Sequence, residues 1–138
     1  MKILADEYVL CTKTKNAHWN VTEPYFYDKH KFFETRFGQL DAFIDNVAER
    51  IRTIGHFAPS TLKSFLELRR LTEMSREKND SNGIIKKLLS DYQAIIIKLR
   101  ENIHYFAVDL KDAGTSDFIT GLMEEHAKMT CFLRSHLQ

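Results

Sequence analysis

The sequence predicts an all-α fold, a bundle of four long helices with one short extra helix in the connection between the second and third. Only five glycines and two prolines occur among the 138 residues, so few positions interrupt a helix. Apolar residues recur at spacings of three and four over long stretches, and no stretch shows the alternation of a strand. The length and the absence of an internal repeat predict a single domain over residues 1–138.

The first two helices are expected on either side of a short break. The first runs from Met1 to about Val21, where Thr22-Glu23-Pro24 stops it. The second ends at Gly55 and carries the longest apolar repeat in the chain, formed by Phe26, Phe33, Phe37, Leu40, Ile44, Val47, Ile51 and Ile54. This repeat predicts a bundle seam about eight turns long.

The rest of the chain predicts the short helix and two more long ones. Ser60 is expected to cap a short helix that ends near Leu68, and the polar stretch 76–83 is expected to be a flexible linker. A third long helix carries apolar residues from Ile85 to Leu110 and ends within residues 111–114. The fourth is expected to begin at Thr115 or Ser116 and to run to the C-terminus.

Composition excludes several classes of protein. Lys and Arg number 20 against 19 Asp and Glu, and the net charge of +1 gives no general attraction for nucleic acid. The longest apolar run is far shorter than the roughly 20 residues that cross a bilayer, which predicts a soluble protein. Cys11 and Cys131 lie near opposite ends of a chain without a leader peptide, so we expect free thiols and a cytoplasmic location.

Two pairs of polar residues on the second helix have the spacing of metal ligands. His30 and Glu34 stand four residues apart, as do Asp45 and Glu49. Such a pair presents two donor atoms from one helix face, and a mixture of imidazole nitrogen and carboxylate oxygen suits iron, manganese or zinc. Taken singly, each pair is also compatible with a solvated helix face.

The two pairs cannot bind the same ion within one chain. Fifteen residues separate His30 from Asp45, which is roughly 22 Å along a helix axis. They would meet if two copies of this helix packed antiparallel about a two-fold axis near Phe37 and Gly38. The spacing therefore predicts a symmetric dimer with two identical shared sites.

Several segments resemble the family of DNA-binding proteins from starved cells (Dps), the mini-ferritins. These segments are His18-Trp19-Asn20-Val21, His30, Glu34, Asp45-Asn46-Val47-Ala48-Glu49-Arg50, the start 4–10 and the late stretch 120–126. The resemblance implies a ferritin-like bundle with a ferroxidase centre at a two-fold interface. Its catalytic and metal-binding residues would be His18, His30 and Glu34 of one subunit, with Asp45 and Glu49 of the neighbour.

The resemblance also implies a biological role. Family members form a hollow homo-dodecamer that oxidises Fe(II), with hydrogen peroxide or dioxygen, and stores ferric mineral inside, which protects a bacterial or archaeal cell from oxidative damage. Trp19 would be an electron donor beside the site, or an aromatic that fills the dimer interface. Asp112 and Asp117 would line an iron-entry pore, although Asp117 also suits a helix N-terminus and Asp112 a loop.

The sequence departs from the family at two places. The ligand that is often Asp in the family is Glu34 here, and the brief termini lack the Lys-rich tail that binds DNA in relatives. We therefore expect weak or absent DNA binding, even if the particle lies at the nucleoid. The alternatives are a catalytically weak shell that acts as a structural or DNA-protecting particle, or a site that holds zinc or manganese.

Four histidines and one further motif receive no role. Glu101 and His104 form a Glu-x-x-His motif, but the di-iron bundles that use this motif need two copies. His56, His104, His126 and His136 are expected to be surface histidines or histidines with satisfied hydrogen bonds.

Overall fold

A computed structural model, which describes residues 1–22, 25–74 and 80–138, has the predicted all-α architecture. The long helices are α1 (Lys2–Asn20), α2 (Phe26–Thr53), α4 (Ser81–His104) and α5 (Ala113–Ser135). The short helix α3 (Leu62–Leu68) lies in the connection between α2 and α4, and a π-helical turn, η1 (Tyr105–Asp109), follows α4. The four-helix bundle with its short extra helix is therefore confirmed, and the described residues contain no strand.

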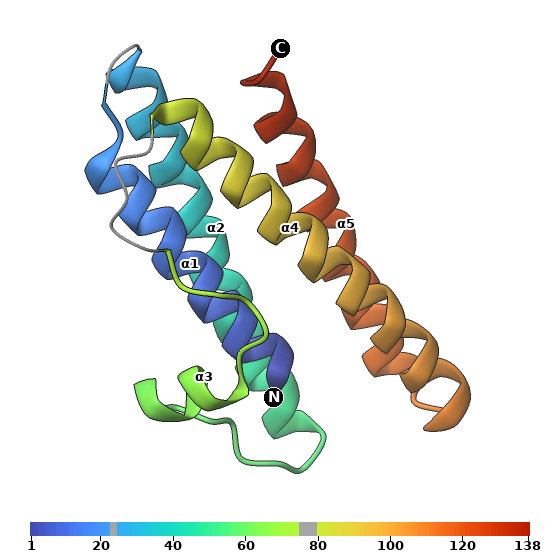
Figure 1. Ribbon diagram of the computed structural model, residues 1–138. Helices are drawn as coiled ribbons and strands as arrows, with labels where there is room; N and C mark the ends of the chain where they lie inside the picture. The colour runs from blue at the N-terminus through green and yellow to red at the C-terminus, as the bar shows by residue number, and fades with distance from the viewer. Residues whose placement is uncertain (23–24, 75–79) are drawn as a thin grey trace.

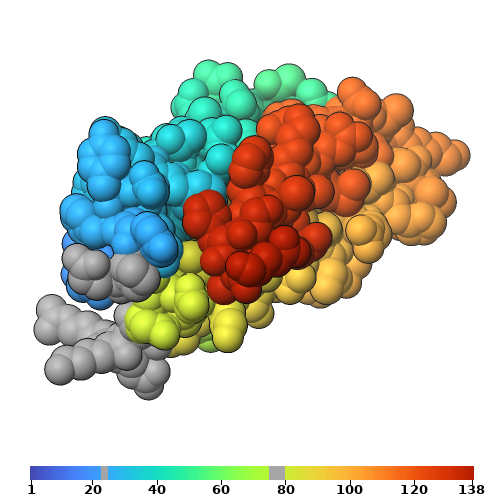
Figure 2. Space-filling view, turned by 90° about the horizontal axis from the view of Figure 1, so that it is seen from above, coloured from blue at the N-terminus to red at the C-terminus, as the bar shows by residue number. Residues whose placement is uncertain are grey.

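The long helices form two antiparallel hairpins (Figure 1). Helix α1 lies against α2 and α4 lies against α5, while the connection that carries α3 returns along α1 so that α4 runs parallel to α2. One long crossover of this kind is typical of ferritin-like bundles. From the end of the bundle (Figure 2), the C-terminal part of α5 lies between α2 and the first turns of α4.

Most of the apolar repeat of α2 lies in or against the core, as predicted, although Phe26 at its start is 46% exposed. Phe33, Leu40, Val47 and Ile51 are buried, and the other helices contribute the residues that fill the space between the hairpins, among them Leu4, Leu10, Ile85, Leu88, Tyr92, Leu99, Ile119, Met129 and Leu133. Each large apolar side chain that is fully buried contributes about 1.5–3 kcal/mol relative to exposure in water. The core therefore follows the 3.6-residue periodicity of the sequence.

Three helix ends differ from the prediction. The cap of α3 is Thr61 and not Ser60, because Thr61 and Ser64 each accept a hydrogen bond from the other's backbone N–H, at 3.1 and 3.2 Å. The cap of α5 is Asp112 and not Thr115 or Ser116, so residues 113 and 114 belong to the helix. The third long helix is α-helical only to His104 and continues as η1.

The linker predicted over residues 76–83 does not extend to residue 83. Residues 75–79 and the break at 23–24 lie outside the described residues, but residues 81–83 form the first turn of α4. Asp80 caps this turn, since its carboxylate accepts a hydrogen bond from the Gly83 N–H at 2.7 Å. Both cysteines are free, as predicted. None of the helices in the described ranges has the length and apolarity needed to span a membrane.

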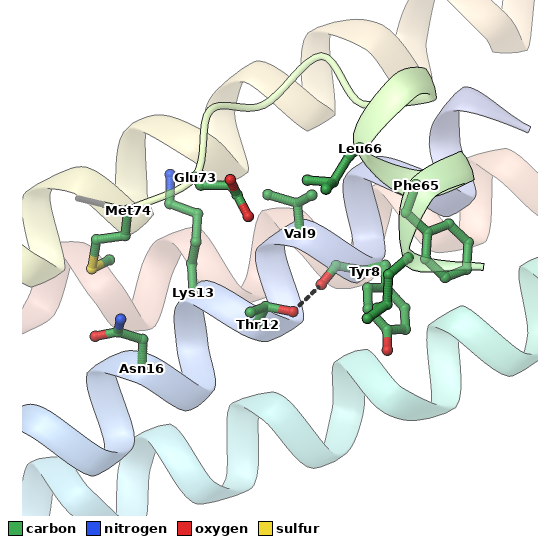
Figure 3. Close-up of a pocket in the computed structure, with 10 residues that line it drawn as sticks. Tyr8, Val9, Thr12, Lys13, Asn16, Phe65, Leu66, Glu73 and Met74 are labelled. Carbon is green, nitrogen blue, oxygen red and sulfur yellow. Dashed lines mark hydrogen bonds between the residues drawn. The ribbon is translucent and has the colours of Figure 1, made fainter. Parts of the chain in front are cut away.

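Polar contacts and an aromatic stack attach the connection to α1. The buried Asp6 carboxylate accepts hydrogen bonds from the Arg70 backbone N–H at 2.6 Å and from its Nε at 2.7 Å. The rings of Tyr8 and Phe65 stack at 4.3 Å. Between α1, α3 and the connection remains a hollow of about 310 Å³ (Figure 3), lined by Tyr8, Val9, Thr12, Lys13, Asn16, Leu62, Phe65, Leu66, Glu73 and Met74.

Candidate metal centre

Two of the predicted ligands, His18 and His30, lie against each other where α1 ends and α2 begins. Their rings stack with centroids 3.7 Å apart and planes inclined by 26°. His18 Nδ1 donates a hydrogen bond to the His30 carbonyl oxygen at 2.8 Å, and His30 Nδ1 donates to the His18 carbonyl oxygen at 2.9 Å. The two residues therefore join the ends of the two helices by a reciprocal pair of bonds.

These bonds determine which nitrogen of each ring is available to a metal ion. A carbonyl oxygen carries no hydrogen, so each Nδ1 must carry the proton of its ring. In the neutral imidazole the lone pair then lies on Nε2. A metal-binding histidine commonly donates its other N–H to a carbonyl in this way, which holds the ring in one orientation. Both histidines consequently have the tautomer that coordination through Nε2 requires.

The fold provides a reason for one of these bonds. The carbonyl of His18 lies in the last turn of α1, where backbone carbonyls have no donor within the helix. His30 supplies that donor from the second turn of α2. The edge of the Phe37 ring contacts His18 at 5.2 Å between centroids, and Phe26 lies 5.1 Å from His30. The imidazoles are thus held by backbone bonds on one side and by aromatic rings on others.

Glu34, the third predicted ligand on this chain, lies on the exposed surface one helical turn after His30. Its Oε2 accepts a hydrogen bond from Lys31 Nζ at 2.7 Å. This contact with the Lys31 ammonium, with a smaller contribution from the two histidines, lowers the pKa of Glu34. Glu34 is therefore ionised at neutral pH and paired with a lysine.

Asp45 and Glu49 lie farther along α2, and both are exposed. In the described parts of the chain neither carboxylate takes part in an ion pair or a side-chain hydrogen bond, and no three His, Cys, Asp or Glu side chains converge on one point. The structure thus brings His18 and His30 together, with Glu34 one turn away, and leaves the two acids apart from them. The shared arrangement of all five ligands stays a prediction about the assembled protein.

Several aromatic residues close in sequence to His18 and His30 are exposed. Trp19, beside His18, is 69% exposed, and Tyr25 and Tyr27 are exposed to a similar extent. Large aromatic side chains that are exposed are often found at surfaces that contact another protein. Both predicted roles of Trp19, electron donor and interface aromatic, need the indole to be outside the bundle core, where the structure places it.

The two acids of the predicted pore have different surroundings. Asp112 caps α5, since its carboxylate accepts hydrogen bonds from the Thr115 N–H at 2.9 Å and hydroxyl at 2.5 Å, and Arg50 Nη2 lies 3.7 Å away. The bonds from Thr115, with a smaller effect of Arg50, lower the pKa of Asp112. The Asp112 carboxylate therefore already accepts hydrogen bonds from Thr115, and the nearby Arg50 guanidinium partly neutralises its charge.

Asp117 instead shares a surface hollow with other acids. A hollow of about 460 Å³ between α2 and α5 is lined by Asp117, Glu124 and Glu125, together with Asn46 and apolar residues. Of the three acids that line the hollow, Glu125 forms an ion pair with Lys128, whereas Asp117 and Glu124 form no such pair in the described residues. Of the two residues predicted for an iron-entry route, Asp117 has the surroundings that attract a cation.

A buried pair of polar residues in the core was not predicted from the sequence. Glu7 Oε1 lies 2.6 Å from His126 Nε2, and both side chains are fully buried. His126 follows Ile119 and Leu122 and precedes Met129 on the buried stripe of α5. This position on an apolar stripe could have indicated that His126 is buried. Its partner could not be identified, because Glu7 is 119 residues away in the sequence.

The comparisons with known proteins agree with this architecture. Residues 1–138 match the ferritin-like domain family. The chain is 32% identical over 136 residues to DNA protection during starvation protein 2 of Bacillus anthracis, a match that covers 99% of this chain and 92% of the relative. The chain belongs to the Dps family. This Dps-family chain is also 37% identical to a low temperature-induced protein of Nostoc sp., over 98% of its own length and 75% of the relative's.

Solved structures of Dps proteins have the same fold. The structure of Dps from Staphylococcus aureus matches with a TM-score of 0.93 at 26% identity and covers 99% of this Dps-family chain and 91% of its own. Dps from Thermosynechococcus elongatus gives the same TM-score and identity, and the match covers 99% of this chain and 86% of that one. The similarity therefore extends over nearly the whole bundle, including α3.

Proposed function

We propose that this Dps-family protein stores and detoxifies iron in the cytoplasm. It oxidises Fe(II), preferentially with hydrogen peroxide, at a site shared between two subunits, and it deposits ferric mineral inside a hollow dodecamer. The observation that carries this proposal is the stacked pair His18 and His30, with both Nδ1 atoms bonded to carbonyls and both Nε2 atoms free to coordinate. Membership of a family whose named relatives include a DNA protection during starvation protein supports it.

The proposed ligands suit a reaction that converts Fe(II) to Fe(III). Neutral imidazoles bind the reduced ion without adding charge, while the carboxylates of Glu34, Asp45 and Glu49 stabilise the oxidised ion more strongly than the reduced one. Each Fe(II) loses one electron, and a peroxide that accepts two electrons is reduced to water. Peroxide consumed at held iron forms less free hydroxyl radical, so DNA and other molecules are protected without being bound.

The shared site needs two copies of α2 in antiparallel contact. Asp45 and Glu49 are exposed and have no ion pair in the described chain, which is the state expected of ligands that face a neighbour. Trp19 and the nearby exposed aromatics would then be covered by the same neighbour and protect the site from water. Asp117 and the acids beside it would attract Fe(II) toward the interior.

A direct test follows the formation of ferric iron. Fe(II) is added without oxygen, peroxide follows, and absorbance is compared for the native protein, His30→Ala, Asp45→Ala and the control His104→Ala. The control removes the exposed histidine of the Glu-x-x-His motif and should behave as the native protein does. Loss of rapid oxidation in the first two variants alone supports the proposal, and rates equal to buffer for the native protein would refute it.

Mixing two inactive variants tests whether the ligands are shared. Chains with His18→Ala and His30→Ala retain the acids, and chains with Asp45→Ala and Glu49→Ala retain the histidines. Random assembly of equal amounts should restore about a quarter of the sites, because only one of the two sites in a mixed dimer is intact and half of the dimers are mixed. Confirmed mixed assembly with no recovered oxidation would show that the ligands are not shared.

A further inference from the structure

Four carboxylates lie along one face of α2, and lysines neutralise two of them. Glu34, Asp41, Asp45 and Glu49 are spaced by seven, four and four residues, which places them on the same side of the helix. Lys31 pairs with Glu34 at 2.7 Å, and Lys15 of α1 pairs with Asp41 at 3.2 Å. In contrast, Asp45 and Glu49 form no ion pair in the described chain.

We propose that Lys31 is a resident cation that a divalent metal ion must displace or oppose at Glu34, so that this lysine weakens metal binding and Glu34 is the last ligand to engage. The inference deepens the proposed function and rests on it, since it concerns regulation of the same site. The contact itself is direct, because Lys31 Nζ hydrogen-bonds to Glu34 Oε2, an oxygen that would otherwise be free to coordinate.

The sign of the effect follows from the charges. Near neutral pH an ordinary glutamate is fully ionised, so removal of Lys31 leaves the charge of Glu34 unchanged. What removal does change is the repulsion between an ammonium and a doubly charged ion. At neutral pH Lys31 therefore repels the metal ion and does not increase the negative charge of Glu34 that attracts it.

Coulomb's law sets the size of the effect. A single and a double charge about 5 Å apart in water, screened as in 0.15 M salt, repel enough to weaken binding about five-fold. The same arithmetic gives about ten-fold at 0.01 M salt and less than about two-fold at 1 M. The two partners are about half exposed, which justifies the dielectric constant of water and the full effect of salt.

The order of ligand engagement has the same origin. The imidazole Nε2 atoms and the carboxylates of Asp45 and Glu49 are free to bind without losing another contact. Glu34 alone must either give up its contact with the Lys31 ammonium or bind the metal ion beside that positive charge. The first ion therefore binds to the other four ligands before Glu34 moves, and Lys31 sets the cost of that last step.

The test measures Co(II) binding by the visible absorbance of the coordinated ion, so no oxidation is involved. The assembled native protein is compared with Lys31→Met, Lys31→Arg and Lys98→Met at three salt concentrations. Lys98 is a matched control, because it forms an exposed pair with Glu101 three residues on, at 2.9 Å, in α4. A fifth sample, Asp45→Ala/Glu49→Ala, defines the part of the signal that belongs to the shared site.

We expect Lys31→Met to bind Co(II) about five-fold more tightly at 0.15 M salt, with the gain declining as salt rises. Lys31→Arg and Lys98→Met should equal the native protein. Equal affinities for Lys31→Met and the native protein at low salt, with binding that still depends on Asp45 and Glu49, would overturn this inference and leave the shared site intact. A native protein whose Co(II) signal does not depend on those acids would overturn the proposed function itself.

Discussion

Replacement of His126 by leucine is expected to destabilise the fold strongly, because it leaves Glu7 in the core without its partner. The two side chains are fully buried and 2.6 Å apart, and Glu7 Oε2 already has no hydrogen-bond partner in the described residues. Removal of one member of a buried pair costs about 3–5 kcal/mol. For a chain of this length a loss of about 4 kcal/mol lowers Tm by roughly 8–16 °C.

The double variant Glu7→Leu/His126→Leu should recover most of this loss. With both polar groups gone, neither position leaves a polar side chain without its partner, and replacement of such pairs by apolar residues is often neutral or stabilising. Met129→Leu is the matched control, since Met129 is almost fully buried in the next turn of α5 and the change conserves volume. The control should cost less than about 1.5 kcal/mol.

The measurement is urea unfolding followed by circular dichroism, at one fixed chain concentration because assembly adds stability by mass action. The interpretation of Glu7 and His126 as a coupled pair requires the single variant to be the least stable of the series. A single variant within about 1 kcal/mol of the native protein, or a double variant as unstable as the single one, would refute it.

Two further predictions concern reactivity and pH. Burial, followed by the hydrogen bond to Asp41, raises the pKa of the Cys11 thiol to about 12. A disulfide reagent at pH 8 should therefore modify only the exposed Cys131 in the folded chain and both thiols after denaturation. Rapid modification of two thiols in the folded protein would contradict this prediction. The lowered pKa of Asp112 means that its ionised form stabilises the fold fully above the ordinary carboxyl value of 3.8 and that this contribution disappears as pH falls through the lower, folded value. The urea midpoint should therefore fall less steeply in acid for Asp112→Asn, which keeps an oxygen acceptor for Thr115 but does not titrate, and equal slopes would count against that assignment.

The helices could be predicted because their signals are local. The repeat that includes Phe33, Leu40 and Val47 needs only neighbouring turns to identify the buried face of α2. The cap of α5 was predicted wrongly because Asp112, Thr115 and Ser116 are all good caps within five positions, and the choice depends on where the chain leaves η1.

In the candidate site, too, the residues could be predicted from the sequence but their contacts between helices could not. Spacing identified His30 as a candidate ligand and the resemblance to the Dps family added His18, yet the reciprocal bonds of the two residues depend on how two helix ends meet and could not be inferred from either. Lys31 was overlooked for another reason, since a lysine three residues before a glutamate is common on exposed helices and usually contributes little. Its importance arises only from the role proposed for Glu34.

The buried pair of Glu7 and His126 also bears on the order in which the chain can fold during synthesis. Glu7 emerges from the ribosome first, and its partner follows 119 residues later on the last helix. Until then the Glu7 side chain lacks this partner, and an unpaired polar group disfavours tight packing of the inner face of the α1 and α2 hairpin against another surface. The pair therefore favours burial of Glu7 only after α5 has been synthesised and has packed against α1.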